Sequence, residues 1–184
     1  MTTKVELPVE VQNVLDWLKE SGFIAAVVGG FCRHKMYGTG TEDIDVAVLV
    51  ENIDDVETLQ TEFGIPAHSN HILARAEKSL YEGHTGFVSD WREGNINIVA
   101  YDKYHYRTIE ALVESFDFNF NMWYITEDGK LSNPNSYVAD RKVVFGNAIG
   151  SRPSIARMAR FAKEFSDWDW SLADAQLKAE AQYS

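Results

Sequence analysis

The stretch VVGGFCRHKMYGTGTEDIDVAVLV, residues 27–50, constrains the fold more than any other part of the sequence. An apolar run is followed at once by Gly29 and Gly30, and a second apolar run begins at Asp43 and Asp45. Because alternate side chains of a strand point to the same face, the two aspartates project together while their neighbours enter the core. Two carboxylates held this close repel each other unless a cation lies between them. The stretch therefore predicts two buried strands with a polar site at their ends.

The same residues have the chemistry of a site for metal and phosphate. Paired carboxylates such as Asp43 and Asp45 suit Mg²⁺ or Mn²⁺, with substrate phosphates and water as further ligands. Gly29 and Gly30 end a strand and open a helix, so backbone amides there can approach a phosphate closely. Each motif alone is common in ordinary turns, and it is their order along the chain that favours a function. Together they predict a site for a metal-bound nucleoside triphosphate.

Composition limits the class of protein. The 184 residues are 45% hydrophobic and 24% charged, which predicts one globular domain, or one domain and the start of a second. The net charge of −11 argues against nonspecific electrostatic binding of nucleic acid over the whole surface, but it is compatible with a local basic groove. Arginine and lysine gather at 33–35, 141–142 and 152–163, and we expect an anionic ligand at one of these clusters.

The sequence also predicts a cytoplasmic protein without membrane contact. The N-terminal MTTKVELPVE has no apolar signal segment, and no apolar run approaches the length of a membrane span. The single cysteine, Cys32, excludes a disulfide framework or a cysteine-based zinc site within one chain. We expect it to be a small core residue.

Hydrophobic periodicity predicts a mixed α/β protein. Strands are expected at 23–28, 44–50, 85–90 and 95–101, the last two joined by a hairpin loop at 91–94. Helices are expected at 8–20, 31–37, 54–63, 108–116 and 153–165. Three segments are less clear: 68–86 is a helix or a loop, 118–126 is a strand or a helix, and 138–145 is a strand.

With these elements in place, the chain resembles a known family. The order Gly-Gly, short helix, acidic strand is similar to the signature of the DNA polymerase β-like nucleotidyltransferase superfamily. More closely, GGFCRHKMYGTGTEDIDV resembles the GG-x-x-R-D…D-I-D opening of class II CCA-adding enzymes and bacterial poly(A) polymerases. Arg33 stands where that family has its arginine, and His34 replaces the aspartate that usually follows.

Two later segments extend the resemblance. Residues 116–145 are similar to the family's R-R-D-F-T-I-N-A segment, although Ser115 and Phe116 stand in place of its two arginines and Asn133 in place of an aspartate. Residues 154–165 resemble the opening of the family's neck helix, R-I-L-R-A-A-R-F-A. The residues that match in the two segments are Asp117, Phe118, Asn121, Arg157, Arg160, Phe161 and Ala162.

The resemblance implies a nucleotidyltransferase head domain at 1–150 and a helical, neck-like segment at 151–184. Its fold would be a small, twisted, mostly antiparallel sheet flanked by helices. Its activity would be transfer of a nucleoside monophosphate from a nucleoside triphosphate to an acceptor, an RNA 3′ end similar to that of tRNA. The family's nucleotide-templating segment and tRNA-holding domains would follow residue 184, so we do not expect CCA addition by this polypeptide alone. A compact head of this kind would suit a bacterial or bacteriophage protein.

The resemblance also implies roles for individual residues. Asp43 and Asp45 would hold the metal and, with Asp117, would be the catalytic residues. The residues implied to bind the nucleotide are Gly29, Gly30 and Arg33, at the β- and γ-phosphates, and Asn121, Arg157 and Arg160, around the nucleotide.

The group that would activate the attacking hydroxyl is left open. Members of the wider superfamily often use a third carboxylate, but the strand after the hairpin has Asn97 at that place, and an amide cannot act as a base. Asp90, Asp102 and Asp117 are the alternatives. Asp117 is favoured by its apolar neighbours and by the family match.

Two other functions stay open. A non-catalytic descendant that binds nucleotide or a protein partner is favoured by the lost arginine pair and the acidic surface. A minimal nucleotidyltransferase that modifies a protein or a small molecule is the other alternative. Trp168 and Trp170 leave open a homodimer or a protein partner at the C-terminal segment.

The histidines favour ordinary surface roles. His68, His71 and His84 do not have the spacing of a metal site and are expected in a surface loop. His105 is expected to pack at a strand end, with stacking on a nucleobase as the alternative.

Overall fold

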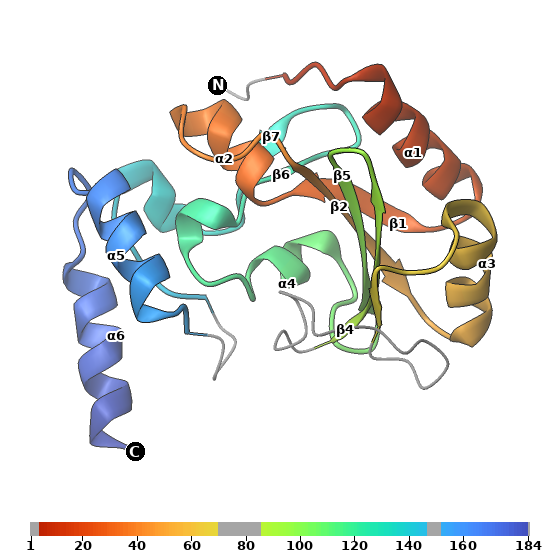
Figure 1. Cartoon of the computed structure of the whole chain (residues 1–184). Helices are drawn as coiled ribbons and strands as arrows, with labels where there is room; N and C mark the ends of the chain where they lie inside the picture. The colour runs from red at the N-terminus through yellow and green to blue at the C-terminus, as the bar shows by residue number, and fades with distance from the viewer. Residues whose placement is uncertain (1–3, 70–85, 147–151, 184) are drawn as a thin grey trace.

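The computed structural model describes residues 4–69, 86–146 and 152–183. Within these residues lies a seven-stranded sheet with the strand order β3-β4-β5-β2-β1-β6-β7 (Figure 1). Neighbouring strands are antiparallel except β2 and β5, which are parallel, so the predicted mixed and mostly antiparallel sheet is confirmed. The strands are β1 (Ile24–Val28), β2 (Ile44–Val50), β3 (His68–Ser69), β4 (Phe87–Glu93), β5 (Ile96–Asp102), β6 (Tyr124–Ile125) and β7 (Leu131–Ser132).

Helices cover both faces of the sheet. In Figure 1, α1 and α3 lie on one face, α4 lies on the other, and α5 and α6 stand together to one side. The helices are α1 (Val9–Glu20), α2 (Gly30–Tyr37), α3 (Ile53–Phe63), α4 (Ile109–Val113), α5 (Ile155–Glu164) and α6 (Ser171–Gln182). Two short 3₁₀ helices, η1 (Asn119–Asn121) and η2 (Ser136–Asp140), precede α5.

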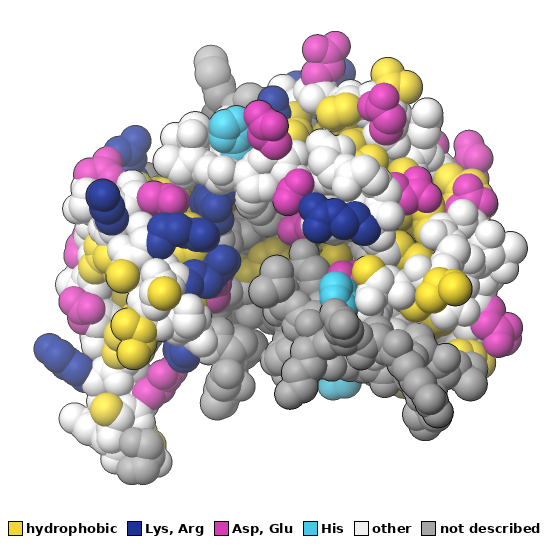
Figure 2. Space-filling view, in the orientation of Figure 1, with side chains coloured by type: hydrophobic (Ala, Val, Ile, Leu, Met, Phe, Trp, Pro, Cys, Tyr) yellow, Lys and Arg dark blue, Asp and Glu magenta, His cyan; other side chains and the backbone are white. Residues whose placement is uncertain are grey.

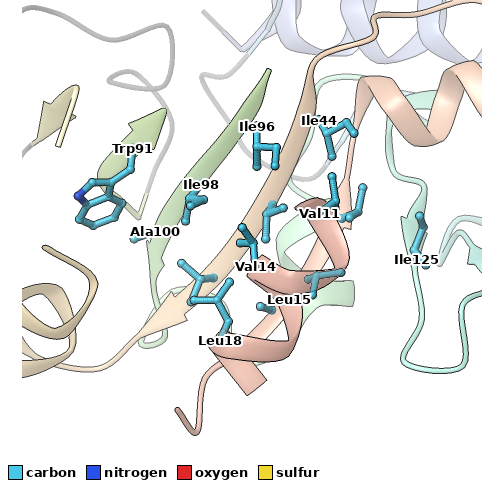
Figure 3. Packing of buried hydrophobic residues seen from close by; sticks show 14 of the residues in the cluster. Val11, Val14, Leu15, Leu18, Ile44, Trp91, Ile96, Ile98, Ala100 and Ile125 are labelled. Carbon is cyan, nitrogen blue, oxygen red and sulfur yellow. The ribbon is translucent and has the colours of Figure 1, made fainter. Parts of the chain in front are cut away.

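Strand alternation divides the core between the two faces. Val27 and Val46 pack in one cluster with α1, whereas the adjacent Ala26 and Ala47 pack in another with α4. On the first face, the apolar stripe of α1 packs against β1 and β2, and Figure 3 shows it in one cluster with Ile44, Ile96 and Ile98. This stripe consists of Val11, Val14, Leu15 and Leu18, all buried.

A third, aromatic cluster attaches the C-terminal helices to the rest of the chain. Phe120 of η1 stacks on Phe165 with 4.0 Å between ring centroids, and it also lies 5.1 Å from Phe161 of α5. Trp168 is buried against the same rings, and Trp170 donates its indole N–H to the carbonyl oxygen of Phe165. The two tryptophans therefore pack within their own chain, and assembly through this segment stays a prediction.

Truncating the centre of this cluster should detach α5. Phe120→Ala is expected to lower the free energy of unfolding by about 3–5 kcal/mol, because a fully buried aromatic ring would leave a cavity. Urea unfolding followed by circular dichroism measures this loss. Ile155→Ala is the control, since Ile155 of α5 is 88% exposed. Losses of equal size in the two variants would contradict the role of the cluster.

Local expectations for the elements differ from the structure in several places. The 91–94 hairpin is present, but Trp91 lies within β4 and donates its indole N–H to the carbonyl oxygen of Gly64, so the turn is shorter than predicted. The strand expected at 138–145 is wrong, because η2 and two isolated bridges occupy this stretch. Segment 118–126 combines both alternatives, with η1 at its start and β6 at its end.

The smaller expectations have mixed outcomes. Cys32 is fully buried, as predicted. His68 lies in β3 and pairs with Asp90 at 2.9 Å, so the surface loop expected for it is wrong, while His71 and His84 lie outside the described residues. His105 packs beside Tyr106 at the end of β5. No helix in the described parts of the chain combines the length and the apolar character needed to cross a membrane.

Candidate functional site

One cavity of about 670 Å³ is lined by all nine residues that were expected to hold the metal, bind the nucleotide or act in catalysis. It opens where the start of β2, the start of α2 and the segments around η1 and α5 meet. Figure 2 shows the hollow with basic side chains on both sides. The predicted residues that line it are Gly29, Gly30, Arg33, Asp43, Asp45, Asp117, Asn121, Arg157 and Arg160.

The two aspartates stand at the start of β2. Ile44 between them is buried, as alternation requires, and both carboxylates line the cavity. Asp45 lies opposite Asn97 of β5, whose side-chain amide donates to Asp45 Oδ1 at 3.0 Å. Asp43 is more exposed; its backbone N–H donates to Thr41 Oγ1.

This donor set fits a Mg²⁺ or Mn²⁺ ion. Asp43 and Asp45 offer carboxylate oxygens at the wall of a cavity large enough for a substrate that would supply the remaining ligands. Among the described residues, no group of three or more His, Cys, Asp or Glu side chains gathers into a metal site. A two-carboxylate site completed by substrate and water is the kind that Mg²⁺ prefers over a closed protein cage.

Gly29 forms the turn between β1 and α2. Its φ of +75° lies in the left-handed region, and a Cβ there would lie 3.8 Å from Asp45 Oδ2. The N–H of Gly29 donates to the carbonyl oxygen of Trp123, so the amides available for a phosphate belong to the first turn of α2. Gly30 begins that turn, and a Cβ there would come within 2.8 Å of Thr41 Cγ2.

Substitution of Gly29 should separate the effect of backbone strain from the effect on ligand binding. Gly29→Ala is expected to cost about 1–2 kcal/mol of stability, because an L-residue would be forced into the left-handed region. It should also weaken nucleotide binding about tenfold by tilting the start of α2, as measured by calorimetry with a non-hydrolysable nucleoside triphosphate. The matched control is Gly22→Ala, with φ +88° and no atom within 4 Å of a Cβ. Equal weakening in both variants would contradict a phosphate site at α2.

A buried polar chain connects α2 to α5. Arg33, only 5% exposed, donates through Nη1 to Asn121 Oδ1, and Asn121 Nδ2 donates to Asp117 Oδ1 at 2.7 Å. Asp117 Oδ2 then pairs with Nε of Arg157. Burial lowers the pKa of Arg33 to about 10, so its guanidinium still carries its charge at neutral pH.

The arginines of this wall share an aromatic support. The guanidinium carbons of Arg33, Arg157 and Arg160 lie 4.7–4.8 Å from the ring centroid of Phe161. Such contacts are favourable and hold the planar groups in place. Phe161, read from the sequence as part of the neck helix, thus positions three cations.

The carboxylates considered as a base have different surroundings. Asp117 accepts hydrogen bonds on both oxygens, including one from the backbone N–H of Phe118 to Oδ1. Asp90 pairs with His68, Asp102 lies 3.4 Å from His105, and neither lines the cavity.

Sequence reasoning missed Arg92 and underused Arg152. Both line the cavity, Arg92 from the end of β4 and Arg152 from the residues before α5. Arg152 belongs to the basic cluster 152–163, so charge patterning marked its region, whereas Arg92 is a single arginine in an expected turn. Arg141 pairs with Asp167 and is not among the lining residues, so the 141–142 cluster does not contribute.

The cavity is positively charged although the protein is acidic. Its described lining includes five arginines and three aspartates, an excess of two positive charges. Ser115 and Phe116, which replace the family's arginine pair, also line it. Its cations thus come from α2, β4 and the α5 region, and the whole fits an anionic ligand bound next to a metal.

Solved structures with a similar fold are tRNA-processing and CCA-adding enzymes. A tRNA-processing enzyme, apo form 2, matches with a TM-score of 0.56 and 19% identity over 91% of this chain and 47% of that chain. A CCA-adding enzyme solved with ATP matches with a TM-score of 0.57 and 17% identity over 92% of this chain and 42% of that one. The chain has the nucleotidyltransferase head fold.

This fold also matches the Thermotoga maritima CCA-adding enzyme in complex with tRNA, with a TM-score of 0.51 and 19% identity over 76% of this chain. The chain spans 34 to 47% of the length of these three solved proteins. Comparisons with models of protein families and with curated protein sequences find no match. The likeness therefore establishes the fold alone.

Proposed function

We propose that this protein is a metal-dependent nucleotidyltransferase that transfers a nucleoside monophosphate from a nucleoside triphosphate to an acceptor hydroxyl at an RNA 3′ end. One observation carries the proposal: a single cavity combines the carboxylates of Asp43 and Asp45, a glycine turn at a helix N-terminus and five arginines. Carboxylates suit a divalent cation, and the other two groups suit phosphates.

The groups divide between the two ends of the substrate. The first turn of α2 and Arg33 would bind the β- and γ-phosphates, because backbone N–H groups and a fixed guanidinium fork both recognise phosphate oxygens. Arg157 and Arg160, supported by Phe161, would line the nucleotide on the opposite side. Asn121 and Asp117 would orient these arginines through the polar chain.

The reaction would be an in-line displacement. The acceptor hydroxyl oxygen forms a bond to the α-phosphorus while the bond from that phosphorus to the bridging oxygen breaks, and pyrophosphate leaves. A divalent cation bound by Asp43 and Asp45 would supply charge stabilisation and a lowered hydroxyl pKa. Arg33 and the amides of α2 would stabilise the charge that develops on the leaving pyrophosphate.

The proton of the attacking hydroxyl needs an acceptor. Asp45 is the better candidate, because its carboxylate lines the cavity at the proposed metal site, where the attacking hydroxyl would be activated. Asp117 accepts bonds on both oxygens and is better placed to position Arg157 than to take a proton. We therefore place Asp117 among the positioning residues.

An RNA acceptor is supported by solved proteins of the same fold, one of which is complexed with tRNA. We further propose that residues 1–150 form the catalytic head and that residues 151–184 begin a neck, since α5 contributes arginines to the cavity. The same reaction would also modify a protein or a small molecule, and the test below distinguishes these acceptors from RNA.

The test is label transfer. The protein is incubated with Mg²⁺ or Mn²⁺, each α-labelled nucleoside triphosphate and, separately, total RNA, a cell lysate or small-molecule acceptors. Label on RNA is the expected result, and label on protein or a small molecule would replace the proposed acceptor. Nucleotide binding without transfer to any acceptor would contradict the proposal and support the alternative of a non-catalytic protein that binds nucleotide.

A further inference from the structure

The β4–β5 hairpin brings a nitrogen donor to each of the two carboxylates. Arg92 on β4 lies opposite Asn97 on β5, and Asn97 lies opposite Asp45 on β2. The amide of Asn97 donates to Asp45, while Arg92 Nη2 lies 3.4 Å from Asp43 Oδ2. One cross-strand pair therefore contacts both aspartates of the proposed metal site.

The Arg92–Asp43 contact differs from the buried contacts around Arg33. The side chains of Arg92 and Asp43 are 55% and 52% exposed, and an ion pair this open to water contributes little and breaks easily. It still places a positive charge beside two neighbouring carboxylates that would otherwise repel each other. The guanidinium thus supplies part of the compensation that a divalent cation would supply.

Arg92 also faces the substrate space. It lines the cavity from the β4 side, whereas Arg152, Arg157 and Arg160 line it from the α5 side. Basic side chains stand on both sides of the hollow in Figure 2. A phosphate chain bound between these walls would meet cations from both.

We propose that Arg92 is a charge-compensating and phosphate-binding residue that alternates between two partners. It neutralises Asp43 in the metal-free protein, and it turns to the anionic substrate once the carboxylate of Asp43 binds a divalent cation. The inference rests on the proposed function for the identity of the substrate, but its first half concerns only the carboxylates. The physical cause is charge: a cation on Asp43 repels the guanidinium, and bound phosphates attract it.

Two binding measurements with Arg92→Gln test the alternation. Mn²⁺ binding to the nucleotide-free protein, followed by electron paramagnetic resonance, should become up to about fivefold tighter, because a competing cation is removed. Binding of a non-hydrolysable nucleoside triphosphate with Mn²⁺ present should become about tenfold weaker, because a phosphate contact is lost. Opposite directions in the two assays are the signature of a residue that changes partner.

Two further variants sharpen the test. Arg92→Lys keeps the positive charge and should restore both values most of the way to wild type. Lys103→Gln is the matched control: it removes a cation paired with Glu51 at the far end of β5 and should change neither value. Thermal unfolding of each variant checks that the fold is intact.

Several outcomes would overturn the inference. These are equal Mn²⁺ affinity in wild type and Arg92→Gln, no Mn²⁺ binding to either, or shifts in the same direction in both assays. Transfer activity is separate: opposite shifts in a protein that transfers no label would contradict the proposed function and leave the role of Arg92 standing.

Discussion

Replacing Asp43 or Asp45 with asparagine is expected to reduce label transfer about a thousandfold or more. The two carboxylates at the start of β2 are the proposed metal ligands. A metal that stabilises transition-state charge is worth several kcal/mol, and about 4 kcal/mol corresponds to a thousandfold change in rate. Asparagine keeps the shape of each side chain and removes its charge. Initial rates at saturating nucleotide and Mg²⁺ measure the loss.

The control for these variants is Asp140→Asn. Asp140 is an exposed carboxylate of η2 that does not line the cavity, so its loss should leave transfer unchanged. The fold of Asp43→Asn and Asp45→Asn should survive, since both replace a charge at a wet cavity wall. Transfer that persists in either variant within tenfold of wild type would contradict the proposed metal site.

Replacing Arg33 with methionine should affect both stability and ligand binding. The free energy of unfolding is expected to fall by about 2 kcal/mol, because Asn121 would lose a charged donor in a buried position. Nucleoside triphosphate binding should weaken at least about tenfold, since charge-assisted bonds to phosphate are among the stronger hydrogen bonds. Urea unfolding and calorimetry measure the two effects.

Lys35→Met is the matched control for this prediction. Lys35 is an exposed cation of the same helix and does not line the cavity, so neither stability nor binding should change appreciably. Arg33→Lys separates charge from geometry, because lysine keeps the charge and loses the planar fork. If nucleotide binding is as tight in Arg33→Met as in Lys35→Met, Arg33 has no role in phosphate binding.

Local patterning predicted most of the sheet and its helices. The continuous apolar runs became β1 and β2, and the helical spacing of Val11, Val14, Leu15 and Leu18 became α1. Prediction was weaker where side-chain periodicity is absent. Segment 138–145 is apolar and β-branched in part, yet Val143 and Phe145 are buried by the aromatic cluster and not by a ladder of strands.

The sequence by itself determined that the two carboxylates lie on one face of a strand and that a glycine turn joins the preceding strand to a helix. Spacing along a strand and backbone freedom are local properties. Only the tertiary structure decided what surrounds these residues. Arg92 reaches Asp43 through strand pairing, and the arginines of α5 reach the cavity because Phe161 and Phe120 pack together. Such contacts join residues far apart in the chain, and no local pattern specifies them.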